Sequence, residues 1–182
     1  MANERSATGG SRLTIRQTSA STRGELLEME ARYPPHSPRP PAHYHPYQEE
    51  RFQVLQGRFR TGINGMEKVY ETGETLSVPA NTPHWMHNIS DVEGYLLWQV
   101  RPALKTQAFL ETMWGLAADG KTNASGVPNL LQLAVILREY ADEFRAVSPP
   151  YPLQRVLFGL LAPIGRLLGY QPRYDRYSKE TP

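Results

Sequence analysis

Four side chains between residues 43 and 84 have the types and spacing of a metal site. His43 and His45 flank a single tyrosine, and Glu50 follows five residues after the second histidine. Histidines two residues apart on an extended strand point to the same side, so both imidazoles can reach one ion. Glu50 can add an oxygen ligand from the next strand. His84 lies more than thirty residues further along and can join only if the chain folds back, so the spacing predicts a barrel as well as a site.

The residue types define the chemistry of this site. The chain has no cysteine, which excludes disulfides, thiolate zinc sites and a cysteine nucleophile. Imidazole and carboxylate donors suit a divalent transition metal, namely iron, manganese, nickel or zinc, and the sequence does not choose among them. Four protein ligands on an octahedral ion leave two neighbouring positions for water, dioxygen or a chelating substrate, which permits catalysis. Glu50 can serve as a ligand, as a catalytic base after dissociating, or as both.

The elements that must position these side chains are predicted to be short strands. Residues 13–18 and 25–32 alternate or carry β-forming side chains, and five prolines within residues 33–41 form a stiff extended loop that delivers His43 and His45. Asn64-Gly65 is a strong two-residue hairpin signal, because both central positions of that turn favour positive φ. Further strands are predicted at residues 50–56, 57–63, 66–71, 74–78, 84–89 and 95–101.

The pattern changes after residue 102. Helical apolar spacing predicts helices at residues 104–118, 129–144 and 153–170. We therefore expect a disordered N-terminus at 1–12, a barrel at 13–102, a helical extension packed on it at 103–170, and a polar tail at 171–182. The last helix is apolar around most of its circumference and needs cover. Docking on the barrel, a dimer contact and a membrane surface all fit this pattern.

The ligand residues and nearby turn residues resemble the two motifs of the cupin superfamily. The first motif is glycine, five residues, His-x-His, three or four residues, Glu, six residues and Gly. The second is glycine, five residues, Pro-x-Gly, two residues, His, three residues and Asn. Two motif glycines are replaced, by Ser37 and by Asn81, and asparagine tolerates positive φ. The matching residues are His43, His45, Glu50 and Gly57 in the first motif and Gly73, Pro79, His84 and Asn88 in the second.

This resemblance implies a mainly β fold, a double-stranded β-helix (jelly-roll) barrel carrying about three C-terminal α-helices. It also implies one divalent metal (Fe, Mn, Ni or Zn) held by His43, His45, Glu50 and His84, and a homodimer. The implied function is an oxidoreductase of dioxygenase type acting on a small oxygen-bearing organic molecule, since quercetin dioxygenase and acireductone dioxygenase share such ligand sets. A non-catalytic ligand-binding or sensing protein and a metal-dependent isomerase of the phosphomannose isomerase sort are the alternatives, because a fold does not fix the reaction.

Strand parity predicts which other side chains line the pocket. Phe52 and Val54 share a face with Glu50, and Met86 shares a face with His84. These residues are core by default and contact substrate if the pocket reaches them. Gln99 and Arg101 are predicted to contact an oxygen-rich ligand if the polar face of their strand points inward. The alternative for Arg101 is a cap at the barrel end.

The composition limits the partners and the location of the chain. Twenty basic and eighteen acidic side chains among 182 residues leave a net charge of +2, and no basic stripe interleaved with aromatic residues supports nucleic-acid binding. The N-terminal residues carry no apolar stretch after their charges, which excludes a signal peptide or membrane span there. We therefore expect a cytoplasmic protein with a small-molecule ligand.

Overall fold

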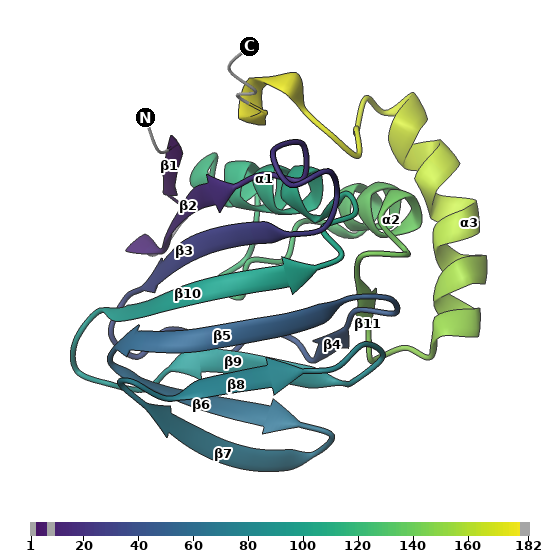
Figure 1. Cartoon of the computed structure of the whole chain (residues 1–182). Helices are drawn as coiled ribbons and strands as arrows, with labels where there is room; N and C mark the ends of the chain where they lie inside the picture. The colour runs from purple at the N-terminus through teal and green to yellow at the C-terminus, as the bar shows by residue number, and fades with distance from the viewer. Residues whose placement is uncertain (1–2, 7–9, 179–182) are drawn as a thin grey trace.

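The computed structural model describes residues 3–6 and 10–178, with side chains from residue 10 onward. Its strands form two sheets in which every described pairing is antiparallel, with the orders β1-β2-β3-β10-β5-β8 and β11-β4-β9-β6-β7 (Figure 1). The strands are β1 (Asn3–Ser6), β2 (Arg12–Gln17), β3 (Leu27–Tyr33), β4 (His43–Tyr44), β5 (Glu49–Gln56), β6 (Arg58–Ile63), β7 (Met66–Glu71), β8 (Thr75–Val78), β9 (His84–Asn88), β10 (Gly94–Arg101) and β11 (Arg145–Ala146).

Side chains alternate along the strands, so one face of each of these strands is buried and the other is exposed. On β5, Glu50, Phe52 and Val54 are buried while the residues between them are exposed. On β10, Leu96, Trp98 and Val100 are buried in the same way and lie next to β5. A strand with this two-residue period buries one face against a core and leaves the other face to solvent. Glu50 lies on this buried face, which points to the interior of the barrel.

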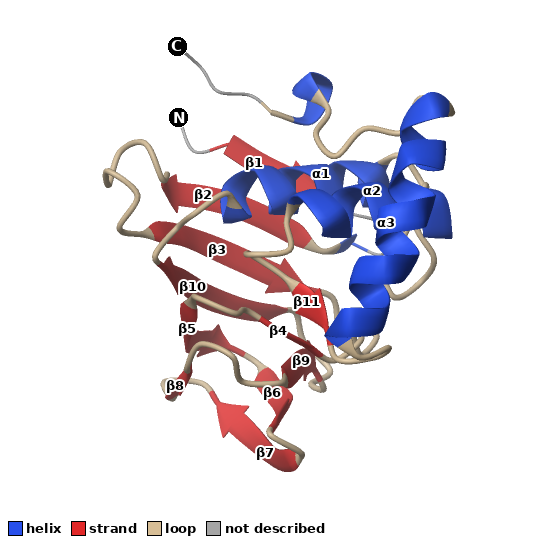
Figure 2. Cartoon of the chain, turned by 90° about the vertical axis from the view of Figure 1, so that its right-hand side faces the viewer, coloured by secondary structure: helices blue, strands red, loops and turns tan. Residues whose placement is uncertain are grey.

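Three helices lie together beside the sheets, α1 (Thr106–Ala118), α2 (Leu130–Glu139) and α3 (Tyr151–Leu167), with α3 outermost (Figures 1 and 2). Phe109 of α1 and Ile136 of α2 belong to the same buried apolar cluster as Met29 of the sheet. α3 packs on α2 at Gly165, where an added Cβ would lie 2.8 Å from Val135. The sheets and the helices therefore share one core. The division into a barrel at 13–102 and an extension at 103–170 stays a prediction.

The opposite face of α3 remains exposed. Leu160 is 67% exposed and Leu167 is 88% exposed, while Phe158 and Ala162 on the inner face are buried. The helix is thus covered by α2 on one side only. None of the helices in the described residues has both the length and the apolar character needed to cross a bilayer.

Three sequence-based boundaries need correction. Residues 3–6, expected to be disordered, form β1 and pair with β2, whereas residues 1, 2 and 7–9 lie outside the described residues. The second helix ends at Glu139 and not at 144, because the chain turns there to form β11. The tail contains a 3-10 helix, Asp175–Tyr177, whose Tyr177 is buried against Gly115. Packing of the Tyr177 ring against α1 anchors this part of the tail.

The turn residues behave as the sequence predicts. Asn64 and Gly65 both have positive φ, and they close the hairpin in which Ile63 pairs with Met66. Asn81, which stands where the cupin motif has glycine, also has a positive φ of 61°. Its backbone N–H donates to the His45 carbonyl at 2.7 Å, so this turn lies directly against the candidate metal ligands.

Asn81→Ala should therefore lower the free energy of unfolding by about 1 kcal/mol, because the left-handed backbone conformation is less favourable for alanine than for asparagine. Asn81→Gly should match or exceed the wild-type stability. Chemical denaturation of the three proteins measures both effects. Equal stability of the alanine and glycine variants would show that the turn relaxes to negative φ.

Candidate metal centre

The two sheets bring the four predicted ligands to one point. His43 on β4 lies opposite His84 on β9 in the five-stranded sheet, and His45 follows β4 directly. Glu50 reaches them from β5 of the other sheet. One potential ligand atom from each of the four residues lies within 4.8 Å of every other. His45, Glu50 and His84 are at most 5% exposed, and His43 is partly exposed. The group therefore has the donors and the spacing that a metal ion requires.

Backbone carbonyls fix the tautomer of all three imidazoles. A carbonyl oxygen can only accept a hydrogen bond, so each contacting Nδ1 must carry a proton, and in the neutral ring Nε2 then keeps its lone pair. Anchoring of the remote nitrogen in this way is typical of histidines that ligate metals. The three Nδ1 atoms donate to Pro41 O at 3.2 Å from His43, to Glu143 O at 2.5 Å from His45, and to Thr82 O at 2.9 Å from His84.

When all three imidazoles are neutral, the atoms that face one another at the centre are acceptors, and only a proton on Nε2 lets an imidazole donate to Glu50. Glu50 Oε2 lies 2.8 Å from His84 Nε2 and 3.3 Å from His45 Nε2. Both Glu50 Oε2 and His45 Nε2 are buried, and neither has a hydrogen-bond partner among the described residues. Buried polar atoms without partners carry a desolvation cost unless another group satisfies them. A divalent cation bound by these atoms would satisfy all of them at once, so the residues present fit such an ion.

The pKa values indicate which of these groups carry charge when no metal is bound. Burial opposes the charge of Glu50, but the neighbouring His45 and His84 hold its pKa well below the usual value. Burial among the other imidazoles and Phe144 lowers the pKa of His43 to about 3, and the charges of His84 and His45 add to this shift. Burial acts against protonation of His45 as well, yet the Glu50 carboxylate outweighs it and raises the pKa of His45. At neutral pH, Glu50 is therefore an anion and His43 a free base.

These shifts predict opposite pH dependences with and without metal. In metal-free protein the raised pKa of His45 stabilises the fold below about pH 6.5, and this is lost as pH rises through the folded-state pKa. The lowered pKa of Glu50 stabilises the fold above about pH 4.5. Between these limits both contributions are present. Bound metal requires neutral imidazole, so its stabilising effect grows as pH rises.

We expect the melting temperature of chelator-treated protein to fall from about pH 6 to about pH 8 relative to a Glu50→Gln variant. The increase in melting temperature on adding zinc should grow over the same range. Differential scanning fluorimetry across this range measures both. A zinc-induced increase that is the same at every pH would contradict the assignment of His45 as a group that exchanges a proton for metal.

Two residues not singled out for the site from the sequence complete its walls. Trp98 donates its indole N–H to Glu50 Oε1 at 3.0 Å and stacks on Phe52. Phe144, which follows α2, stacks on His43 with ring centres 4.6 Å apart. The chain around Phe144 is held in place because β11 pairs with β4 and Glu143 supplies the carbonyl that anchors His45. The C-terminal region is therefore part of the site.

The predicted pocket residues separate into two groups. Phe52 and Val54 are buried on the inward face of β5 beside Glu50, and Met86 is partly buried against the core, so their contact with substrate stays a prediction. The polar face of β10 does not point inward. Gln99 donates to Glu28 across the outer face, and the exposed Arg101 donates to Gln99. The structure thus removes Gln99 and Arg101 from the site, because the apolar residues of β10 fill the interior.

The remaining two histidines lie outside the cluster of ligands. His36 is exposed and its Nε2 lies 2.8 Å from Asp91. His87 contacts the Ser37 carbonyl through Nδ1 at 3.0 Å. Their placement makes them suitable controls for substitutions at the candidate ligands.

Comparison with solved structures supports the fold. KdgF from a Halomonas species superimposes with a TM-score of 0.51 at 14% identity, covering 58% of this chain and 90% of that protein. An RmlC-like cupin from Shewanella frigidimarina gives a TM-score of 0.50 at 19% identity, covering 59% of this chain and 89% of that one. The predicted double-stranded β-helix barrel with helices is therefore confirmed.

Sequence comparison identifies relatives over most of the chain. An oxidoreductase of Arthrobotrys oligospora is 30% identical over 161 residues, which are 78% of this chain and 60% of the relative. The probable oxidoreductase virH of Hypocrea virens is 31% identical over 157 residues, 78% of this chain and 68% of the relative. The chain thus spans between three fifths and about two thirds of the length of these relatives. A 48-residue segment is 54% identical to acireductone dioxygenase of Alcanivorax borkumensis, covering 24% of this chain and 25% of that enzyme.

A family model described as the cupin domain matches residues 29–100. That range contains both sequence motifs and all four side chains of the metal-type cluster. The fold, the two motifs and the family model agree, and this chain belongs to the cupin superfamily.

Proposed function

We propose that this protein is a metal-dependent oxidoreductase of dioxygenase type that acts on a small oxygen-bearing organic molecule. The observation that carries the proposal is the convergence of three imidazole Nε2 atoms and one carboxylate on a buried point. The relatives named as oxidoreductases and the segment similar to acireductone dioxygenase support the reaction class.

In this proposal His43, His45, Glu50 and His84 hold the divalent ion. An iron, manganese, nickel or zinc ion held there would supply Lewis acidity and, except for zinc, redox chemistry. The carbonyl anchors hold the three imidazoles in the ligating tautomer. We assign Glu50 the role of ligand, because a carboxylate whose pKa lies well below its usual value is a weak base.

The surrounding residues protect and orient the site. Trp98 holds Glu50 Oε1, which leaves Oε2 directed at the imidazoles of His45 and His84. Phe144 packs on His43, and Trp98, itself stacked on Phe52, packs on Glu50, so aromatic rings limit the access of water to the ligands. An enolate, diol or carboxylate of the substrate can then approach the open positions in an apolar environment, where charged groups interact strongly.

The test is oxygen consumption by the full chain loaded separately with iron, manganese, nickel or zinc. With diketones, flavonoids and phenols as substrates, we expect uptake with at least one redox-active metal and none with zinc. Metal content is measured in parallel, so that inactivity is not confused with an empty site. Stoichiometric metal with no oxygen uptake across the panel would reject the dioxygenase and favour a binding protein or an isomerase. Light scattering of the same samples tests the predicted homodimer.

A further inference from the structure

A cavity of about 300 Å³ lies between α2, α3 and the segment that leads into β11. Figures 1 and 2 place these two helices side by side next to β4 and β11. The size of the cavity falls at the lower end of the range for small-molecule sites. Its walls combine apolar side chains, including Phe144 and Phe158, with three arginines at positions 138, 145 and 155. No acidic residue occurs among the described residues that line it.

The three arginines leave positive charge available at the cavity. Arg155 has no hydrogen bond or ion pair recorded within the described part of the chain, and Arg138 donates one N–H to the Gly159 carbonyl. Arg145 is held in place, since it donates to the Ala141 carbonyl and its guanidinium lies 3.7 Å from the centre of the Tyr151 ring. One carboxylate, Asp142, approaches Arg145 at 3.6 Å and is itself largely exposed. A single exposed carboxylate does not neutralise three guanidinium groups.

Phe144 connects this cavity with the candidate metal centre. The ring lines the cavity and stacks on His43, and it also lies edge-on to His45 with ring centres 6.0 Å apart. A molecule in the cavity would therefore contact a side chain that is itself in contact with two candidate ligands. Phe144 is thus the side chain that separates the cavity from His43.

We propose that this cavity binds a small organic anion, with an aromatic or alkyl body against Phe144 and Phe158 and a carboxylate or similar oxyanion at the arginines. Guanidinium groups pair with such oxyanions through two parallel hydrogen bonds, and their aliphatic stems cover apolar surface. This anion is the substrate of the metal centre, an assignment that rests on the proposed function. The substrate is then negatively charged, and part of its recognition site lies outside the barrel.

The first test uses two fluorescent probes that differ in one group. 8-Anilinonaphthalene-1-sulfonate has an aromatic body and an oxyanion, and N-phenyl-1-naphthylamine has the same body without the sulfonate. We expect saturable binding of the sulfonate at one site per chain and binding of the neutral probe weaker by about tenfold or more. Equal affinities for the two probes would overturn the proposal. Both titrations use the full chain without metal, so the result does not depend on catalysis.

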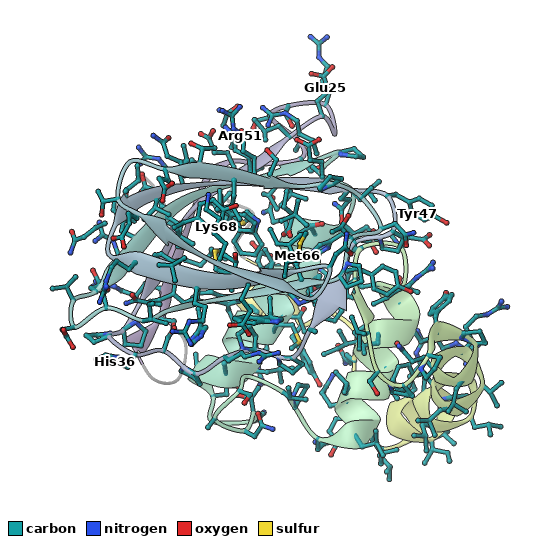
Figure 3. All side chains as sticks on the ribbon, turned by 90° about the horizontal axis from the view of Figure 1, so that it is seen from below. Glu25, His36, Tyr47, Arg51, Met66 and Lys68 are labelled. Carbon is teal, nitrogen blue, oxygen red and sulfur yellow. The ribbon has the colours of Figure 1, made fainter. Side chains whose placement is uncertain are left out.

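The second test uses variants with matched controls. Arg138→Gln combined with Arg155→Gln should weaken binding of the sulfonate about tenfold or more. Arg51→Gln combined with Arg60→Gln removes the same charge from exposed barrel positions and should leave binding unchanged; Arg51 points away from the barrel (Figure 3). Arg155→Gln alone is the control for misfolding. Among the described residues this side chain has no polar partner, so its loss should not destabilise the protein. Equal losses in the cavity and control pairs would overturn the proposal.

A cavity-filling variant tests the location of the probe. Gly159 lines the cavity, and an added Cβ there meets no atom within 4 Å, so Gly159→Leu should occupy free space. We expect it to abolish binding of the sulfonate while raising helix stability. Leu160→Ser combined with Leu167→Ser changes the exposed face of α3 and should not affect binding. Loss of binding in the serine pair, with retention in Gly159→Leu, would place the probe on the exposed face and overturn the proposal.

The last comparison separates this inference from the proposed function. If the protein consumes oxygen with a carboxylate-bearing substrate, Arg155→Gln should raise KM about tenfold with little change in kcat, as expected for lost binding. An unchanged KM would overturn the inference and leave the oxidoreductase function intact. Anion binding that depends on the arginines, in a protein without oxygen uptake under any metal, would reject the function and retain the anion site.

Discussion

His43→Ala combined with His84→Ala should abolish stoichiometric metal binding by the full chain. The double variant removes two of four ligands, one from each of two paired strands, and leaves Glu50 and His45 unable to enclose an ion. We expect the affinity for zinc to fall by more than about 100-fold, beyond the effect of losing a supporting residue. Elemental analysis after dialysis, with competition against a chromophoric chelator, measures the occupancy and the affinity.

The matched control is His36→Ala combined with His87→Ala. It removes the same number of imidazoles from outside the cluster, where one side chain is exposed and the other contacts a loop carbonyl. This control should retain full occupancy. If both double variants hold as much metal as the wild type, the ligand assignment is wrong, and the orphaned acceptors need another explanation.

Trp98→Phe should lower metal affinity by about 10- to 100-fold although Trp98 is not itself a ligand. The substitution keeps an aromatic ring next to Phe52 but removes the indole N–H that holds Glu50 Oε1. The carboxylate then loses its orientation, and one buried oxygen loses its hydrogen bond. Competition titrations with zinc and cobalt measure the loss. The visible spectrum of the cobalt form reports the geometry of the ligand set independently of affinity.

Trp85→Phe is the control for this substitution. Trp85 is 7% exposed, close to the 9% of Trp98, and it packs against Gly62 and Arg39 with no recorded contact to the candidate ligands. Both variants should lose stability from the smaller side chain, and Trp98→Phe should lose more because a buried Glu50 oxygen also loses its hydrogen bond. Only Trp98→Phe should change the metal affinity and the cobalt spectrum. Equal metal affinities in the two variants would show that Trp98 contributes packing and does not orient Glu50 for metal binding.

The part of the site that sequence could predict is the part encoded by side-chain type at fixed intervals. His43 and His45 form a pair at strand spacing, and glycine or asparagine marks the tight turns, as the positive φ of Asn81 confirms. Local alternation also identified most strands to within one or two residues, because each buries one face. These features depend on neighbours along the chain.

The part that could not be predicted depends on long-range pairing. Glu143 anchors His45 through its backbone carbonyl, and any residue type supplies such a carbonyl, so the sequence carries no sign of it. Phe144 fitted the apolar period of a helix, but pairing of β11 with β4 ends that helix early. The choice of inward face on β10 required knowing that Trp98 lies opposite Phe52. Register between strands far apart in sequence is fixed only by the assembled core.

The hydrogen bond between His45 and Glu143 joins residues 98 positions apart, and it has a consequence for synthesis of the protein. All four candidate ligands leave the ribosome well before residue 146, yet the anchor for His45 exists only after the strand at 145–146 has been made and has docked. Contacts of such long sequence separation form late and slowly. If the site binds a metal, a nascent chain that still lacks residue 143 should hold it more weakly than the finished protein.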